Sequence, residues 1–207
     1  KSLKYIKKPD NAYWGMDINP YEIKKFINNK DIKKKFLYKR DKNFKKSAIL
    51  LKNNEIIFIC SNRQEFGPRA LGHRSIVCNP SNIDSVKKIN DTIKMRDFWM
   101  PFTPSILETF KKKYLKKNEK LNLDFMTSCV ETTDLGKVHL KAAIHQSDET
   151  VRPQLVTKKD NSSYYQLINA FKKETGIGAL LNTSLNMHEF PVVNNPTDII
   201  KEILSIG

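Results

Sequence analysis

The sequence predicts an α/β or α+β domain built around a mixed β-sheet, because strand-like runs alternate with helix-like segments along the chain. One run, Glu55–Cys60, is apolar and β-branched, which is typical of a buried strand. Another segment, Ser162–Thr175, is interpreted as a helix, and Gly176 follows it where glycine often ends a helix. With 207 residues, the chain is long enough for one domain with its own core.

Residues 1–20 are predicted to be a linker from a preceding domain, since they are basic, contain proline and glycine, and show little periodicity. The domain itself is expected to span residues 21–207. Its first two helices are expected at Tyr21–Phe26 and Asp41–Leu51. The chain stops inside an apparent helix at Asp198–Ile206, so we expect the domain to be truncated at its C-terminus.

Later elements follow the same patterns. Asn82 or Ser81 is expected to cap a helix that carries one apolar face from Ile83 to Ile93. A polar loop, Asn182–Ser184, is expected directly after the last strand of the domain. The strands expected in this half of the chain are Phe102–Leu107, Val138–Ile144, Val151–Val156 and Ile177–Leu181.

Composition excludes several classes of protein. No apolar run approaches the ~20 residues that span a bilayer, and we expect no signal peptide. Cys60, Cys78 and Cys129 form no C-x-x-C pair, so we expect reduced thiols and a cytoplasmic protein. The net charge of +15 comes from scattered lysines among asparagines, which is typical of a solvated surface. We therefore expect neither membrane nor nucleic-acid partners, although such a surface attracts anionic substrates.

Arginine is used sparingly, with six arginines against 31 lysines, yet Arg63, Arg69 and Arg74 fall within twelve residues. A guanidinium group grips phosphate or carboxylate through two parallel hydrogen bonds, which an ammonium group cannot do. Gly67 and Gly72 add backbone freedom around these side chains. The segment is therefore predicted to be an anion-binding active site after the strand Glu55–Cys60. The alternative interpretation is a surface loop that happens to carry arginines.

Four motifs occur in order: E-F-G-P-R-A-L-G-H-R-S-I at Glu65–Ile76, K-M-R-D-F-W-M-P-F-T-P-S at Lys94–Ser105, H-Q-S-D-E-T-V-R-P-Q at His145–Gln154 and N-T-S-L-N-M-H-E-F-P-V-V at Asn182–Val193. Together they resemble the C-terminal domain of the NodU/CmcH-type carbamoyltransferases, which carbamoylate hydroxyls on antibiotics, nodulation factors and sugars. This resemblance implies a YrdC-like fold, in which a twisted, partly open mixed sheet with flanking helices carries a central concave site.

The resemblance also implies the chemistry. The domain would use ATP and carbamoyl phosphate, with Mg²⁺ as an optional companion, to make carbamoyl adenylate and release pyrophosphate and phosphate. An N-terminal ATPase-like carbamoyltransferase domain, in the same polypeptide or a separate subunit, would carry an iron. That domain would pass the carbamoyl group to a hydroxyl of a small molecule or sugar. Its metal-ligand motifs are absent from this sequence, so no metal site is expected here, and the chain alone should not complete carbamoylation.

By the same resemblance, Arg69, Arg74 and Lys94 are expected to take part directly in the reaction, since phosphoryl transfer needs its charge stabilised. Glu65 is expected to orient an arginine rather than act as a base, because a carboxylate beside three guanidinium groups stays ionised. The residues expected to bind substrate or ATP are Arg63, Gly67, Gly72, Ser75, Arg96, Thr150, Arg152, Gln154, Asn182, Thr183, Ser184 and Asn186.

Each of these assignments has a plainer alternative. Thr150, Arg152 and Gln154 alternate along an expected strand and would share one face, but polar residues also alternate by chance. Lys94 and Arg96 could simply complement the dipole at a helix C-terminus. The polar residues that begin the fourth motif could form an ordinary Asx or serine turn.

The sequence departs from the family pattern at two places. Met100 stands where the family has arginine, and Glu189-Phe190 stands where it has glycine and glutamate. A degenerate, non-catalytic domain is therefore one alternative. A basic YrdC-like RNA-binding module is another, and it would need exposed aromatic side chains among its cations. The only candidates for that role are Tyr164-Tyr165 and Phe98-Trp99.

Overall fold

The structure is a computed structural model, which describes residues 9–97, 100–117 and 121–199. Its centre is a five-stranded sheet in which all neighbouring strands are antiparallel except the last pair, β3 and β6, which are parallel. The sheet is therefore mixed, as predicted. In spatial order its strands are β1 (Ile57–Cys60), β2 (Arg74–Cys78), β7 (Ala179–Ser184), β3 (Thr103–Leu107) and β6 (Gln154–Val156).

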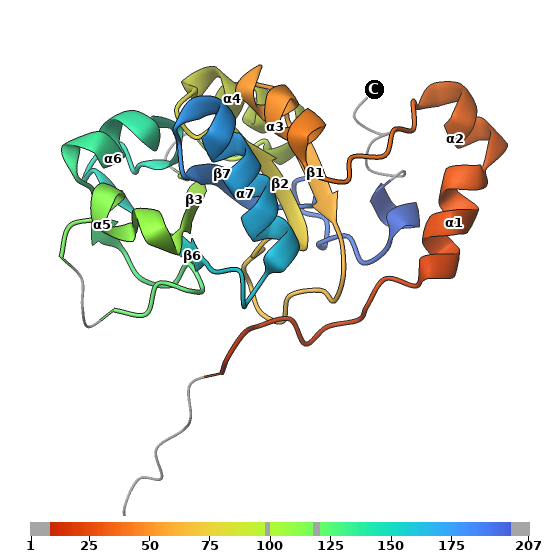
Figure 1. Cartoon of the computed structure of the whole chain (residues 1–207), viewed down its shortest axis with the longest axis horizontal. Coiled ribbons are helices and arrows are strands. Elements are labelled where there is room, and N and C mark those ends of the chain that lie inside the picture. Colours follow the sequence, from red (N-terminus) through yellow and green to blue (C-terminus); the bar gives the residue numbers. More distant parts are fainter. Residues whose placement is uncertain (1–8, 98–99, 118–120, 200–207) are drawn as a thin grey trace, which may run out of the picture.

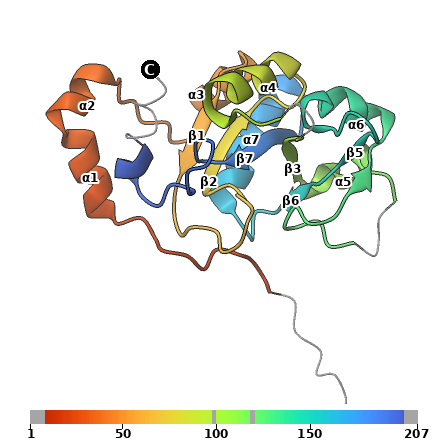
Figure 2. The ribbon, with the colours of Figure 1, turned by 180° about the vertical axis from the view of Figure 1, so that it is seen from behind.

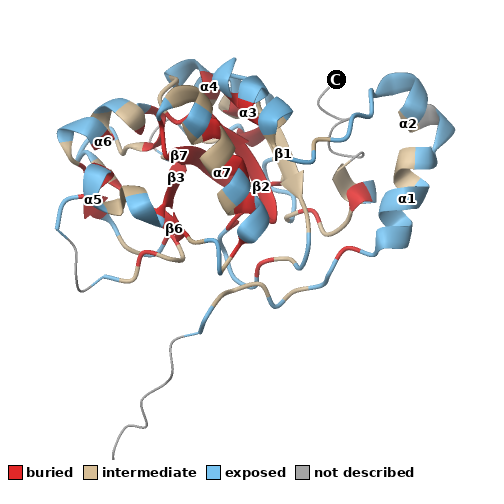
Figure 3. Cartoon of the chain, in the orientation of Figure 1, coloured by how far each residue is buried: buried red, intermediate tan, exposed pale blue. Residues whose placement is uncertain are grey.

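Helices cover both faces of the sheet (Figures 1 and 2). Helices α3 (Lys45–Lys52) and α7 (Ser162–Thr175) pack on one face, and α4 (Ile83–Ile89) packs on the other. The side chains of β2 alternate accordingly, with Val77 in the core under α3 and α7 and its neighbour Ile76 in the core under α4. Figure 3 shows the central strands as the most deeply buried elements.

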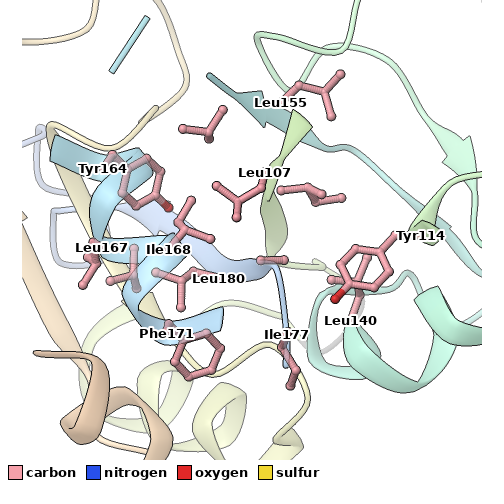
Figure 4. Packing of buried hydrophobic residues seen from close by; sticks show 14 of the residues in the cluster. Leu107, Tyr114, Leu140, Leu155, Tyr164, Leu167, Ile168, Phe171, Ile177 and Leu180 are labelled. Atoms are coloured by element: carbon pink, nitrogen blue, oxygen red, sulfur yellow. The ribbon is translucent and has the colours of Figure 1, made fainter. Parts of the chain in front are cut away.

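Helix α7 anchors the larger core (Figure 4). Its buried side chains are Tyr164, Leu167, Ile168 and Phe171, whose spacing places them on one helical face against the sheet. Each such apolar side chain contributes about 1.5–3 kcal/mol on burial. The helix has the predicted bounds, and the predicted Gly176 ends it at φ 80°, a left-handed conformation that suits glycine.

The remaining elements lie at the two ends of the sheet (Figure 1). On the side of β1, α1 (Pro20–Asn28) and α2 (Lys30–Lys35) stand apart from the sheet, and α1 has no buried residue. Beyond β6, a small ribbon pairs β4 with β5 near α5 and α6. The bounds of these and of the short helical turns are β4 Val130–Glu131, β5 Thr150–Val151, α5 Lys111–Tyr114, α6 Asp134–His139, η1 Asn90–Lys94, η2 Glu108–Phe110 and η3 Lys141–Ala143.

Several sequence predictions need correction. The strand expected at Val138–Ile144 is instead the end of α6 followed by a 3-10 turn. Thr133 starts this helix, because its hydroxyl accepts a hydrogen bond from the N–H of Gly136 at 3.0 Å. The strand expected at Glu55–Cys60 is β1, but it is a half-buried edge strand rather than a buried one. The helix expected at Asp198–Ile206 lies outside the described residues from residue 200 onward.

Two further corrections concern the motifs. The arginine-rich segment does not end as a loop, because Arg74 and Ser75 begin β2, an interior strand of the sheet between β1 and β7. Likewise, Asn182–Ser184 is not a loop but the last half of β7, so strand pairing fixes these residues.

Candidate active site

Three arginines from three different motifs line one small pocket: Arg69, Arg96 and Arg152. Burial, followed by the nearby charge of Arg152, lowers the pKa of Arg69. Burial, then the charges of Arg69 and Arg152, lowers the pKa of Arg96. Guanidinium groups nevertheless stay protonated in proteins. No Asp or Glu is among the residues that line this pocket of about 70 Å³, so it concentrates positive charge suited to an anion.

A larger cavity of about 310 Å³ adjoins this pocket. The two share Pro68, Arg69 and Ala70 of the arginine-rich loop, and Ser184 at the end of β7. Arg69 therefore stands at the boundary between a small cationic pocket and a space at the lower end of the usual range for small-molecule sites. The far wall of the larger cavity is formed by Asn186, Phe190, Pro191 and Val192.

Glu65 shapes the loop that carries Arg69. Its Oε1 accepts hydrogen bonds from the backbone N–H groups of Leu71 at 2.6 Å, His73 at 2.8 Å and Arg74 at 3.3 Å. The carboxylate is buried and draws the two ends of the loop together. Glu65 thus orients backbone rather than an arginine side chain, which corrects the expectation from sequence.

The two loop glycines differ in what they do. Gly72 has φ 108°, and a Cβ there would lie 2.3 Å from the ring of Tyr164, so only glycine fits. Its N–H donates a hydrogen bond to Ser75 Oγ at 2.9 Å. The N–H of Gly72 and the hydroxyl of Ser75 are therefore hydrogen-bonded to each other instead of facing a ligand. Gly67, at φ 122°, lies in the wall of the larger cavity with open space where a side chain would be.

A chain of buried amides and hydroxyls fixes the other side of the loop. Gln154 Nε2 donates to the carbonyl of Leu71 at 2.8 Å, and Ser105 Oγ donates to Gln154 Oε1 at 2.7 Å. Asn182 Nδ2 donates to Ser105 Oγ and to the carbonyl of Ala70, both at 3.0 Å. Asn182 also lines the arginine pocket, and its buried Oδ1 has no hydrogen-bond partner. Gln154 and Asn182 therefore hold the loop directly beside Arg69.

Arg74, which we expected to act on phosphate, is fully buried and used internally. Its guanidinium donates to backbone carbonyls of Ser61 at 2.7 Å and Asn194 at 3.0 Å, and to two more carbonyls nearby. Arg63 is similarly engaged at the surface, where it donates to the carbonyls of Trp14 and Gly15. Both arginines therefore hold backbone segments together, and neither lines the arginine pocket or the larger cavity.

Lys94 is also buried, and its Nζ holds the turn that follows β7. It donates to the carbonyl of Ser184 at 2.5 Å, to the carbonyl of Asn186 at 2.7 Å and to Asn186 Oδ1 at 2.8 Å. Ser184 faces both cavities and Asn186 faces the larger one. Lys94 is thus placed behind the residues that line the site, rather than in the lining where we expected it.

Arg96 reaches the pocket because of an irregular turn that the sequence did not predict. The helix that begins with α4 widens into a π-helical turn, η1, and ends at Met95 with φ 43°. Asn90 then clamps the backbone of Arg96, accepting from its N–H at 2.9 Å and donating to its carbonyl at 2.8 Å. The guanidinium lies 5.3 Å from the centre of the Phe102 ring. Asn90 carries no sequence signal, since it lies six residues from its partner.

The third motif does not form one continuous strand. Pro153 separates β5 from β6, and these strands belong to different sheets. Thr150, Arg152 and Gln154 therefore do not share a face. Thr150 lies in the β4–β5 ribbon, where its hydroxyl donates to Asp148 Oδ1 at 2.8 Å, and it lines neither cavity. Arg152 enters the pocket because it lies in the break between the two strands.

The remaining predicted residue, Thr183, lines the arginine pocket. Two residues that were not predicted also line it: Thr103, which belongs to the second motif, and Met126, which lies outside the motifs. Within the part of the chain that the structure describes, no group of three His, Cys, Asp or Glu side chains could hold a metal ion. No helix among the same residues is long and apolar enough to cross a bilayer.

A mixed sheet that brings three motif arginines to one pocket defines an α/β domain with a cationic pocket, and comparison with known proteins identifies its family. Residues 48–207 match the family described as the carbamoyltransferase C-terminus. The chain belongs to this family. It is 34% identical to the nodulation protein NolO of Bradyrhizobium diazoefficiens over 95% of this chain and 36% of NolO. It is 29% identical to the 3'-hydroxymethylcephem-O-carbamoyltransferase of Streptomyces clavuligerus over 67% of this chain and 26% of that enzyme.

Among solved structures, full-length HypF in its phosphate- and nucleotide-bound form is similar to this fold. It superposes with a TM-score of 0.57 at 16% identity, over 83% of this chain and 21% of HypF. Similarity at this identity concerns the fold alone, and it agrees with the predicted YrdC-like mixed sheet with flanking helices. The chain spans about a third of the length of NolO and a smaller share of the cephem enzyme.

Proposed function

We propose that this chain forms carbamoyl adenylate from carbamoyl phosphate and ATP. The observation that carries this proposal is the convergence of Arg69, Arg96 and Arg152 on one pocket beside a cavity of about 310 Å³. Water first splits carbamoyl phosphate into carbamate and phosphate. A carbamate oxygen then attacks the α-phosphorus of ATP, and the bond to the leaving pyrophosphate breaks.

The two adjoining spaces suit the two parts of the nucleotide. The small pocket takes phosphoryl groups, whose negative charge its three guanidinium groups stabilise. The larger cavity takes the nucleoside, with Phe190 and Pro191 as apolar wall. Arg69, at the boundary, faces the α- and β-phosphates between which the bond breaks. A fixed cation at that place favours the transition state over the ground state, because negative charge builds up on the leaving pyrophosphate there.

In this proposal the chain does not bind a metal ion of its own. No carboxylate is among the residues that line the arginine pocket, so Mg²⁺ would arrive as a companion of the nucleotide. An iron does not fit the described residues, which hold no suitable group of three ligands. In this proposal the iron belongs to the N-terminal ATPase-like domain, in the same polypeptide or another subunit.

The family supports a division of labour. The cephem relative is by name an O-carbamoyltransferase, and the chain covers only a part of it. We therefore assign activation of the carbamoyl group to this chain and transfer to a small-molecule or sugar hydroxyl to the remainder of the whole protein. The solved structure of HypF is a phosphate- and nucleotide-bound form, which agrees with ATP and carbamoyl phosphate as substrates.

The two competing interpretations receive less support. Of the aromatic pairs that the sequence offered to an RNA-binding module, Tyr164 is buried beneath Gly72 and Tyr165 is half-buried against the core. The other pair, Phe98-Trp99, lies outside the described residues. A degenerate domain was suggested by the loss of arginine at Met100. The pocket has three arginines without it, and Met100 is not among the residues that line either cavity.

The test measures phosphate and pyrophosphate release by the purified full chain supplied with ATP and carbamoyl phosphate. We expect pyrophosphate only when both substrates are present, with an equal amount of phosphate above that released from carbamoyl phosphate alone, and carbamoyl adenylate by mass spectrometry. We expect no carbamoylated sugar. Release of neither product by folded protein would favour the degenerate domain, and a carbamoylated acceptor would contradict the division of labour.

A further inference from the structure

The N-terminal segment Ala12–Met16, which the sequence suggested to be linker, runs along the arginine-rich loop. Figures 1 and 2 both show it crossing beneath the loop between β1 and β2. Three backbone hydrogen bonds join them: Gly15 N–H to the carbonyl of Gln64 at 2.9 Å, Gln64 N–H to the carbonyl of Met16 at 2.9 Å, and Phe66 N–H to the carbonyl of Ala12 at 2.7 Å. We call this segment, residues 12–16, the strap.

Side chains fasten the strap to both arms of the loop. On the first arm, Arg63 Nε donates to the carbonyl of Gly15 at 3.0 Å, and its Nη2 donates to the carbonyl of Trp14 at 2.9 Å. On the second arm, the hydroxyl of Tyr13 donates to the carbonyl of Leu71 at 2.9 Å. The strap therefore bridges the start and the end of the loop, with Arg69 between them.

Tyr13 is the best-anchored residue of the strap. Its hydroxyl also accepts a hydrogen bond from Asn161 Nδ2 at 3.2 Å, at the start of α7. Its ring centre lies 4.1 Å from that of His73. Burial raises the pKa of its phenol, so the hydroxyl stays a donor. Tyr13 and Gln154 donate to the same carbonyl, that of Leu71, two residues after Arg69.

The strap fits the loop too closely to be an incidental contact. A Cβ on Gly15 would lie 2.8 Å from the backbone oxygen of Gln64 and 2.9 Å from its Cβ. Only glycine allows the two backbones to pair here. The family match begins at residue 48, so the strap lies outside the matched residues.

We propose that Tyr13 is a positioning residue, which acts through the strap to hold Arg69 in the orientation that binds a phosphoryl group. Glu65 fixes the loop from inside, and the strap fixes it from outside. A loop held at both ends opens less often, and a site that is already ordered binds its ligand at a lower entropic cost. This inference rests on the proposed function for its ligand but not for the order of the loop.

The test compares the full chain with Tyr13→Phe, which removes only the hydroxyl. Hydrogen exchange of residues 63–74 is measured first, because it needs no ligand. Losing the two part-buried hydrogen bonds of this hydroxyl, to the carbonyl of Leu71 and from Asn161, should speed exchange in the loop about three- to tenfold and weaken pyrophosphate binding by a similar factor. Exchange in β7 should stay unchanged. Tyr38→Phe is the matched control, since Tyr38 is 64% exposed. Arg63→Ala, at the surface, is a second variant that loosens the strap without removing core side chains.

Unchanged exchange in the loop of both variants would overturn the proposal. So would faster exchange spread over the whole sheet with unaltered pyrophosphate affinity, because a general loss of stability has that signature. If the wild-type chain binds no pyrophosphate, the proposed function fails, while exchange in the loop still decides whether the strap orders it.

Discussion

Arg69 has its proposed role because of where its guanidinium stands, between two cavities that would hold adjoining parts of one nucleotide. Arg74, five residues later, has the same side chain, but its guanidinium N–H groups donate hydrogen bonds to backbone carbonyls. The chemistry of a guanidinium group suits both tasks, because carbonyl and phosphate oxygens are both acceptors. The residue type alone therefore cannot separate a ligand-binding arginine from a structural one.

Replacing Arg69 by lysine should be nearly as damaging as replacing it by alanine. Lysine keeps the charge but loses the planar pair of donors, so each change should cost about 1.5–3 kcal/mol of pyrophosphate binding. Titration calorimetry measures this. Arg40→Lys, at an exposed position remote from the motifs, should bind like wild type. An Arg69→Lys variant with most of the wild-type affinity would show that charge alone suffices.

Glu189 stands where the family has glycine, and it has φ 62°. A side chain in this left-handed region costs about 1–2 kcal/mol, whereas glycine adopts it freely. Glycine also gains entropy in the unfolded chain, which offsets part of this relief of strain. Glu189→Gly should therefore raise the free energy of unfolding by only about 0.5–1 kcal/mol. Denaturant unfolding measures the change. Glu55→Gly, at an exposed residue whose own φ is not positive, should lower stability, and equal effects of both changes would refute the argument.

His73 should make stability depend on pH. Burial lowers its pKa below the ordinary value of 6.5, so the unfolded chain takes up this proton more readily than the folded one. The folded state thus has its full stability above pH 6.5 and loses stability as the pH falls below it. Between about pH 7.5 and 5.5, wild type should lose more stability than His73→Asn, and denaturant unfolding at the two pH values measures the difference. Parallel pH profiles of the two proteins would contradict this.

At the scale of elements, the π-helical turn η1 and the end of β7 form one unit, joined by Lys94. Removing its ammonium would take one hydrogen-bond donor from the carbonyl of Ser184, and from the carbonyl and Oδ1 of Asn186. Lys94→Met should therefore lower the free energy of unfolding by about 2–4 kcal/mol. Arg96→Met should weaken pyrophosphate binding with little loss of stability. A Lys94→Met variant as stable as wild type would contradict this structural role of the ammonium group.

The elements that sequence patterns predicted are those whose signals are local. Helix α7 follows from its apolar face and from Gly176, and β3 follows from an apolar run. Strand β2 was missed because it begins inside a motif rich in charge. The residues Val138–Ile144 look like a strand by composition, but the cap at Thr133 starts a helix before them. Strand β2 is fixed by its pairing with β1 and β7, which a single sequence does not show. At Val138–Ile144 the composition of the segment did not reveal that a helix had already started at Thr133.

At the scale of the whole molecule, the order of four motifs was enough to predict the family and the mixed sheet, and both are confirmed. It was not enough to divide the motif residues between the lining of the site and its support. Arg69, Arg96 and Arg152 line the pocket, while Arg74 and Lys94 lie behind its walls. That division depends on burial and on internal hydrogen bonds, which arise only when the chain folds.

The central claim is that Arg69, Arg96 and Arg152 together hold the phosphoryl groups of ATP. The most direct measurement is a crystal structure of the full chain with a non-hydrolysable ATP analogue and inorganic phosphate. We predict phosphate oxygens within hydrogen-bonding distance of all three guanidinium groups, and the nucleoside in the cavity lined by Phe190. A nucleotide bound elsewhere, with the three arginines contacting no phosphate, would contradict the account.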